Sequence, residues 1–498
     1  MKTSTLSWIS KLFRYTLFVG AILYFLVYFI LVFYRIQYPF ELEWMEGGSV
    51  DHVGRILSGQ KLYVSPSLEF VPFAYPSLYF YLSAAISKVI GIGFTPLRIL
   101  SFISSLGCFF VIFLMVKRET RSNFSAILAS SLFAATFRIS GSWFDIARVD
   151  SLFLFFLLTA LYLIRFNDSL KSYILAGIFI SLSFLTKQTA LAISLPIMLY
   201  CILLGRRCSL SFIGTIIAIV GVSTLLLNYI HDGWYSYYVF GLLKQRHMSI
   251  NRIVYFWIKD IISPLSVASF AVIFYLFTEF LGSDKKNYLF YLLTLIGMLG
   301  GSLVSRSQVG GYSNVLFPAY AIISILFGLA IHTASEMIQA VSENKRKIME
   351  IYIYLVCTIQ FVGLAYNPFT QIPTKEDLKA GKEFINTMAQ LNGDILVPSH
   401  GYLPVLAGKR SYAHAMAVVD VLGSYSPAKA KLIDEIRQEI RKRRFSAIIL
   451  DAPWFPEVSE KYYSRQGAVF DSPTIFWPVT GLRTRPEWIY VPKRNDTN

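Results

Sequence analysis

The sequence predicts an all-α polytopic membrane bundle that is followed by a small C-terminal α/β domain. Hydrophobic residues make up 55% of the 498 residues and charged residues only 15%, which is typical of a membrane protein. Apolar stretches of about 20 residues, long enough to cross a bilayer, recur up to residue 367. We therefore predict a membrane domain over 1–367, whose first outer loop is 37–96, and an extracytoplasmic α/β domain over 368–498.

The first apolar stretch, Tyr15–Tyr34, is too long for a signal-peptide core and lacks a small-residue cleavage site. We interpret it as an uncleaved span. Lys2, Lys11 and Arg14 precede it and place the N-terminus in the cytoplasm, because basic residues favour the cytoplasmic side of a membrane. The loop after this span is then outside.

The stretch Ser77–Phe94 is also apolar, but the positions of the basic residues argue against a crossing. If it does not cross, the basic clusters of the later loops face the cytoplasm, and if it crosses they all face outward. We therefore predict an interfacial helix here and about eleven spans in total. The later spans cover 97–116, 123–139, 151–166, 172–186, 189–204, 209–230, 257–280, 287–304, 314–334 and 348–367.

The net charge of +16 is explained by the basic residues of these loops, so we expect contacts with anionic membrane lipids rather than with nucleic acid.

The apolar block Tyr173–Leu204 is interrupted by Lys187 and Gln188. At 1.5 Å per residue the block would be roughly 48 Å long, too long for one crossing. We predict two short helices with Lys187 at their apex near the outer face; a single kinked helix is the alternative.

The C-terminal region alternates charged helices with short β-like runs. The segment KLIDEIRQEIRKRRF has Leu432, Ile436 and Ile440 at helical spacing. Runs typical of strands follow the helices at Asp394–Val397 and Ala447–Leu450. Helices alternating with strands predict a small α/β domain.

With this topology, acidic and basic side chains gather at the outer ends of the spans. Such a concentration of charge costs free energy unless it is used or solvated. A carboxylate can take the proton of an acceptor, and cations stabilise a departing phosphate. Transfer of a sugar from a lipid phosphate needs both. The candidate base is one of Glu46, Glu43 and Asp145, the candidate phosphate-binding residues are Arg148, Lys187 and Arg306, and further candidate lining residues are Asp150, Tyr75, His247 and Arg246.

Structural interpretations of these residues remain open. In one interpretation Asp145 and Asp150 do no more than pair with Arg148. In the same way, Lys187 can extend to the membrane interface without binding substrate. Arg306 can contact a lipid headgroup. No spacing of His and Cys supports a structural zinc site, although a divalent cation is compatible with the carboxylates.

Several motifs, in order, carry a family resemblance. They are Met45-Glu46-Gly47, GRILSGQKLY, Tyr75-Pro76-Ser77-Leu78, Pro96-Leu97-Arg98, FDIARVDSL and Thr186-Lys187-Gln188. Over roughly residues 10–210 the chain resembles the GT-C glycosyltransferases that use polyprenyl-phosphate sugars, in the branch of the protein O-mannosyltransferases and the lipid A aminoarabinose transferase.

The resemblance implies an inverting glycosyltransferase that moves a sugar from a polyprenyl-phosphate donor to an extracytoplasmic glycan, lipid or protein. Relatives usually carry Asp where this chain has Met45, so the base must be Glu46 or Glu43. We favour Glu46, because Gly47 and Gly48 after it would admit a substrate closely. We also expect its loop to be polar and wet, so that Glu46→Gln would fold. The alternatives are a transporter or flippase of a lipid-linked sugar and an inactive relative that acts as a scaffold.

Overall fold

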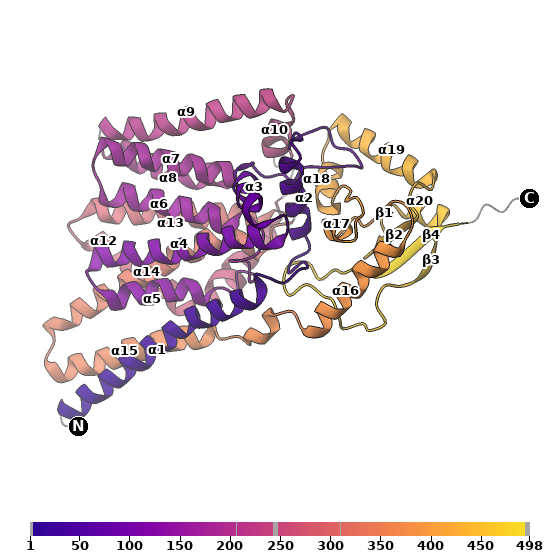
Figure 1. Ribbon diagram of the computed structural model, residues 1–498. Coiled ribbons are helices and arrows are strands. Elements are labelled where there is room, and N and C mark those ends of the chain that lie inside the picture. The colour runs from indigo at the N-terminus through magenta and orange to yellow at the C-terminus, as the bar shows by residue number, and fades with distance from the viewer. Residues whose placement is uncertain (1–2, 206, 243–247, 309, 494–498) are drawn as a thin grey trace, which may run out of the picture.

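The computed structural model describes residues 3–205, 207–242, 248–308 and 310–493. Long helices run side by side in a bundle, and a smaller domain lies beyond one end of it (Figure 1). The short helix α2 (Glu46–Leu57) lies across that end, between the bundle and the small domain. The first outer loop is therefore placed between the two parts of the molecule.

The bundle helices coincide with the predicted apolar stretches. Among the described residues, five helices are long and apolar enough to cross a membrane, or seven if each bent pair is one span. The chain is thus an integral, multi-pass membrane protein. The bundle helices are α1 (Thr3–Arg35), α4 (Phe94–Thr120), α5 (Asn123–Ala135), α6 (Asp150–Phe166), α7 (Leu170–Thr186), α8 (Thr189–Leu203), α9 (Arg207–Ile230), α12 (Ser266–Leu281), α13 (Lys285–Ser307), α14 (Phe317–Met337) and α15 (Glu343–Gly363).

The prediction of one continuous span over 257–280 is wrong. A segment made of α11 (Ile250–Tyr255) and a π-helix (Phe256–Ile262) meets α12 at an angle of 91°. The bend contains Pro264, which has no N–H to donate and whose ring obstructs a continuing helix. Gln360 satisfies backbone groups that the bend leaves open. Its amide donates to the Pro264 carbonyl at 2.9 Å and accepts from the Ala268 N–H at 3.0 Å.

The prediction of two short helices around Lys187 is confirmed. The Lys187–Gln188 pair separates α7 from α8, so the single kinked helix is excluded. The stretch predicted as an interfacial helix forms the short helix α3 (Leu78–Ile90) of 13 residues. Its place at the membrane interface stays a prediction, because α5 in the bundle is equally short.

The C-terminal domain contains a four-stranded mixed sheet in the order β1-β2-β4-β3. The predicted strands are confirmed as β1 (Ile395–Leu396) and β2 (Ala447–Leu450), which pair in parallel. The antiparallel strands were not predicted, because β3 (Tyr463–Ala468, YSRQGA) has no apolar alternation. The remaining elements are β4 (Trp488–Pro492), α16 (Lys375–Gln390), α17 (Leu403–Leu406), α18 (Ala415–Leu422), α19 (Pro427–Arg441) and α20 (Pro456–Tyr462).

The C-terminal domain packs directly on the first outer loop. Phe40 packs edge-to-face against Phe476 with ring centroids 5.4 Å apart, and a Cβ added to Gly381 of α16 would lie 2.2 Å from the Phe40 ring. His400 bridges the two parts through Glu41 at 2.5 Å and Asp451 at 2.9 Å. These buried contacts hold the loop that carries the candidate carboxylates.

Candidate active site

A cavity of about 540 Å³ lies where the bundle end meets the C-terminal domain. Four loops at the predicted outer ends of the spans contribute to its wall. They are the first outer loop, the loop before α6, the α7–α8 connection and the loop between α13 and α14. The cavity-lining residues from these loops include Glu43, Tyr75, Arg148, Lys187, Gln308 and Asn314. Of the other predicted lining residues, His247 and Arg246 lie outside the described residues.

Glu43 is a buried carboxylate at the wall of this cavity, with a side chain 1% exposed. Its Oε2 accepts hydrogen bonds from Arg148 Nη1 and from the Met45 N–H, both at 3.2 Å. No described residue donates to its Oε1. Burial and the nearby Glu46 charge raise the pKa of the Glu43 carboxyl to about 7, although Arg148 opposes this. Glu43 therefore has a free oxygen and a pKa suited to proton transfer.

Glu46 is buried more completely, at 0% exposure, and is not part of the cavity wall. Arg98 donates to both of its carboxylate oxygens, at 2.9 and 2.6 Å. The backbone N–H groups of Leu42 and Ala147 each donate to it at 2.7 Å. Burial alone would raise the pKa of Glu46, but Arg98 and these amides lower it overall. Its hydrogen-bonding capacity is fully used.

The expectation of a wet loop around Glu46 is wrong, and so is the expectation that its glycines admit substrate. A Cβ on Gly47 would lie 1.8 Å from the Gly401 carbonyl oxygen. A Cβ on Gly48 would lie 2.5 Å from the Phe73 ring. The glycines instead allow the backbone of the C-terminal domain and an aromatic ring to approach α2.

Arg148 connects Glu43 to the aromatic part of the cavity. Its Nη2 donates to the Tyr75 hydroxyl at 2.9 Å, and its guanidinium lies 4.9 Å from the centre of the Trp143 ring. Arg148 has a raised pKa, since Tyr75, Glu43 and Asp150 outweigh the effect of burial. It remains a cation that faces both Glu43 and the cavity.

Lys187 is the second cation on the wall, as its place at the α7–α8 apex predicts. Its Nζ donates to Asp150 Oδ1 at 2.6 Å, and Asn314 donates to the same oxygen at 2.9 Å. The other oxygen of Asp150 has no partner among the described residues. Asp150 thus holds Lys187 at the cavity instead of pairing with Arg148.

The structure does not bring Asp145 and Arg306 to the cavity wall. Asp145 is buried against Arg35, with Oδ2 3.0 Å from Arg35 Nε, and burial raises the pKa of the Asp145 carboxyl. Arg306 donates to both oxygens of Asp260, at 2.7 and 3.2 Å, and to the Gly311 carbonyl at 2.8 Å. The charge of Arg306 is therefore neutralised inside the bundle.

Two further cations line the cavity and were missed. Arg252 donates to the Gln308 carbonyl at 2.7 Å, so its partner there is a neutral group. Arg483 belongs to the C-terminal domain and lies over the Trp477 ring at 4.7 Å. Arg252 lies between the predicted spans 209–230 and 257–280, so its place in a loop was within reach of sequence reasoning. Nothing in the sequence connects Arg483 to the bundle.

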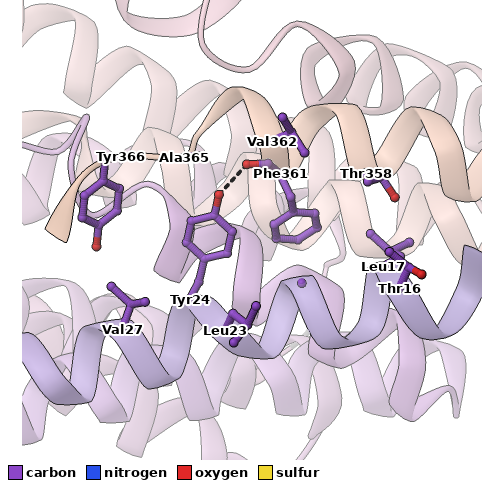
Figure 2. A pocket seen from close by; sticks show the side chains of 11 residues that line it. Thr16, Leu17, Leu23, Tyr24, Val27, Thr358, Phe361, Val362, Ala365 and Tyr366 are labelled. Atoms are coloured by element: carbon purple, nitrogen blue, oxygen red, sulfur yellow. Dashed lines mark hydrogen bonds between the residues drawn. The ribbon is translucent and has the colours of Figure 1, made fainter.

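The described residues offer neither a metal-binding cluster nor a carboxylate or cation at the second large cavity. No group of three or more His, Cys, Asp or Glu among the described residues is placed to hold a metal ion. A second cavity of about 370 Å³ lies between α1 and α15 (Figure 2). Its wall is apolar apart from threonine and tyrosine hydroxyls, and the Tyr24 hydroxyl donates to the Phe361 carbonyl. It has no carboxylate or cation for transfer chemistry.

The chain is similar to known proteins in part of its sequence and in its fold. Residues 74–230 match the family described as dolichyl-phosphate-mannose-protein mannosyltransferase. The fold is similar to the crystal structure of ArnT from Cupriavidus metallidurans in the apo state, with a TM-score of 0.60 and 12% identity over 94% of this chain and 97% of that chain. For ArnT bound to undecaprenyl phosphate the TM-score is 0.59 at 12% identity, over 96% and 98% of the two chains.

A third solved structure is the archaeal oligosaccharyltransferase AglB from Archaeoglobus fulgidus, in complex with an inhibitory peptide and a dolichol-phosphate. Its TM-score is 0.55 at 12% identity, over 99% of this chain and 75% of that chain. No curated protein sequence matches the chain. The fold is that of the GT-C membrane glycosyltransferases. The resemblance predicted from the motifs is confirmed, since the chain is similar to the mannosyltransferase family in sequence over 74–230 and to ArnT and AglB in fold.

Proposed function

We propose that this protein is an inverting glycosyltransferase that moves a sugar from a polyprenyl-phosphate donor to an extracytoplasmic acceptor, with Glu43 as the general base. The observation that carries the proposal is the Glu43 carboxylate, which has one unpartnered oxygen, a pKa of about 7 and a place on a cavity wall beside two cations. A general base is most effective when its pKa lies near the working pH.

Glu43 also occupies the place of the acid that this chain lacks. Relatives usually carry Asp at the position of Met45. Here the Glu43 side chain turns toward Met45 and accepts its backbone N–H at 3.2 Å, and Met45 itself lines the cavity. The side chain of residue 43 thus places a carboxylate next to residue 45, where relatives usually carry Asp. This supports Glu43 over Glu46, whose four hydrogen bonds leave no oxygen for a substrate proton.

In the proposed reaction Glu43 Oε1 takes the proton of the acceptor hydroxyl or amine, whose lone pair attacks the anomeric carbon of the sugar. The bond between that carbon and the phosphate oxygen breaks, and the electron pair leaves with the polyprenyl phosphate. One displacement inverts the anomeric configuration. Arg148, Lys187 and Arg252 stabilise the phosphate charge that develops, because preorganised cations interact more strongly in a buried site than in water.

Two of the similar solved structures hold lipid phosphates: undecaprenyl phosphate in ArnT and dolichol-phosphate in AglB. We extend this donor class to the present chain, together with an orientation of about eleven spans, a cytoplasmic N-terminus and an outer C-terminal domain. The orientation has a direct test in intact cells. A cysteine at Asn392 should react with an impermeant thiol reagent and one at Ser283 should not; the reverse pattern would overturn it.

The function is tested by mass spectrometry of lipids and glycans from cells with and without the protein. A polyprenyl-phosphate sugar should accumulate in cells that lack it, and a glycan should disappear. The accumulated lipid, once purified, should lose its sugar and release polyprenyl phosphate when incubated with the full-length protein and an envelope extract. Movement of the intact lipid across vesicles without cleavage would indicate a flippase, and binding without turnover would indicate a scaffold.

A further inference from the structure

A segment of the C-terminal domain enters the active-site cavity and contacts the catalytic loops. Thr480 donates its N–H to the Leu42 carbonyl at 3.2 Å. Its hydroxyl oxygen accepts the Trp143 indole N–H at 3.1 Å and donates to the Gly141 carbonyl. Thr480 is 8% exposed. One buried residue therefore joins the two loops: its backbone N–H contacts the loop of Glu43, and its hydroxyl contacts the loop of Arg148.

The next residue, Gly481, packs against Glu43 itself. A Cβ added to Gly481 would lie 2.5 Å from Glu43 Cγ and 3.0 Å from Oε1. Real Cβ atoms essentially never approach as closely as 2.5 Å, so only glycine fits here without displacing the glutamate. Gly481 also has a φ of +83°, which most residues adopt only with strain.

Few hydrogen bonds fix the position of the Glu43 carboxylate. Its two hydrogen bonds, from Arg148 and Met45, are both long at 3.2 Å, and Oε1 has no partner among the described residues. The charged groups that face it are Arg148 from the loop before α6, Glu46 from α2 and Glu41 from its own loop. The Gly481 backbone is thus a wall against which the side chain rests.

We infer that Thr480 and Gly481 are positioning residues: the C-terminal domain completes the catalytic site by holding Glu43 in place. The inference rests on the proposed function, because it assumes that Glu43 is the base. It assigns the domain a part in the chemical step that is separate from any contact it makes with the acceptor.

The test is Gly481→Ala in the full-length protein, with Gly408→Ala as the matched control. Gly408 lies in the same domain and has a φ of +72°, but a Cβ there would meet nothing within 4 Å. Both variants carry the backbone strain, and only Gly481→Ala displaces Glu43. The assay uses the polyprenyl-phosphate sugar purified from cells that lack the protein and follows release of polyprenyl phosphate across a range of pH.

We expect Gly481→Ala to lower kcat by about ten- to a hundredfold, as misplacement of a catalytic group by about 1 Å does, with little change in KM. The acidic limb of its pH profile should move to higher pH, because a displaced and more desolvated carboxyl has a higher pKa. Gly408→Ala should keep the wild-type kcat and limb. Equal kcat and an equal limb in the two variants would overturn the inference.

Two further variants keep the inference testable if Gly481→Ala folds poorly. Thr480→Val removes both side-chain hydrogen bonds and should lower kcat, whereas Thr480→Ser keeps the hydroxyl and should restore it. Full activity of Thr480→Val would count against the positioning role. Full activity of Glu43→Gln would instead refute the base assignment, so failure of the proposed function and failure of this inference give different results.

Discussion

The predicted first outer loop carries two buried carboxylates three residues apart, Glu43 and Glu46, and each is paired with an arginine. The two carboxylates differ in how many hydrogen bonds they accept. Glu46 and Arg98 satisfy each other: the carboxylate receives four hydrogen bonds, and Arg98 also donates to backbone carbonyls between residues 35 and 40. Glu43 and Arg148 are joined by one bond of 3.2 Å, and one Glu43 oxygen has no described partner. The first pair builds the loop, and the second faces the cavity.

This difference teaches how to separate a structural acid from a catalytic one when both are buried beside arginine. A buried carboxylate that accepts a hydrogen bond at every lone pair is held in its charged form, because protonation would break one of these hydrogen bonds. A carboxylate with a free oxygen and a pKa raised by burial is poised to receive one. The residue types are the same in both pairs, so the inventory of hydrogen bonds decides which acid is structural.

The largest expected effect is on catalysis, in Glu43→Gln. The amide keeps the size of the side chain but does not accept a proton at neutral pH, and loss of a general base typically lowers the rate by about 10²–10⁴-fold. Folding should persist, because Oε1 has no partner to lose. Turnover of the purified donor and thermal unfolding in detergent measure the two properties. Wild-type turnover in this variant would place the base elsewhere.

The second expected effect is on folding, in Arg98→Ala. The substitution leaves Glu46 charged and unpaired at 0% exposure, and breaking a buried ion pair from one side costs about 3–5 kcal/mol. We expect a much lower yield of folded protein and a lower Tm. Arg148→Ala is the control, since its partner Glu43 borders the cavity and bears a weaker bond. An unchanged Tm in Arg98→Ala would show that the first pair is not structural.

The sequence predicts the bundle well, because apolar length is a strong signal that depends little on tertiary contacts. It also brings Lys187 and Arg148 to one cavity, since both follow from the outer ends of spans. It does not distinguish Glu43 from Glu46, because that choice depends on donors from Arg98 and Ala147, which are 52 and 101 residues away from Glu46 in the chain. Such contacts are set by packing and leave no local pattern.

The C-terminal contribution is hidden for the same reason. Gly481 and Arg483 lie in a loop without periodicity, and they reach the cavity only because the whole domain docks on the bundle end. Arg306, by contrast, was predicted as a site residue and is not one on this cavity wall. Its place at a span end suggests phosphate binding, but it pairs with Asp260, on the bent segment before Pro264. Only the fold assigns the partners of these two arginines.

A third prediction extends the comparison to the cations. Lys187→Ala removes a charged group from the cavity wall and should weaken binding of undecaprenyl phosphate by about ten- to a hundredfold, since a hydrogen bond to a charged group contributes about 1.5–3 kcal/mol. Arg306→Ala is the matched control and should leave that affinity unchanged, because Arg306 already pairs with Asp260. Titration of detergent-solubilised variants with the lipid measures this. Equal weakening in both variants would contradict the separation of the two cations.

The smallest expected effect is on the pH dependence, and it tests the comparison without any substitution. The pKa of Glu43 is about 7, so kcat/KM should fall below that pH and reach about a tenth of its plateau near pH 6. If Glu46 were the base, its pKa, lowered from 4.5, would leave the rate flat down to about pH 5.

The contribution of Glu43 to the stability of the folded protein should change in the opposite direction to kcat/KM and rise as the pH is lowered. Because the folded-state pKa of Glu43 lies above its unfolded value of 4.5, the folded protein binds the extra proton between these two values. Wild type should therefore gain stability relative to Glu43→Gln as the pH is lowered from about 7 to 4.5. Parallel Tm curves for the two proteins, or a flat kcat/KM profile through pH 7, would show that the free oxygen of Glu43 is not the site at which the proton is received.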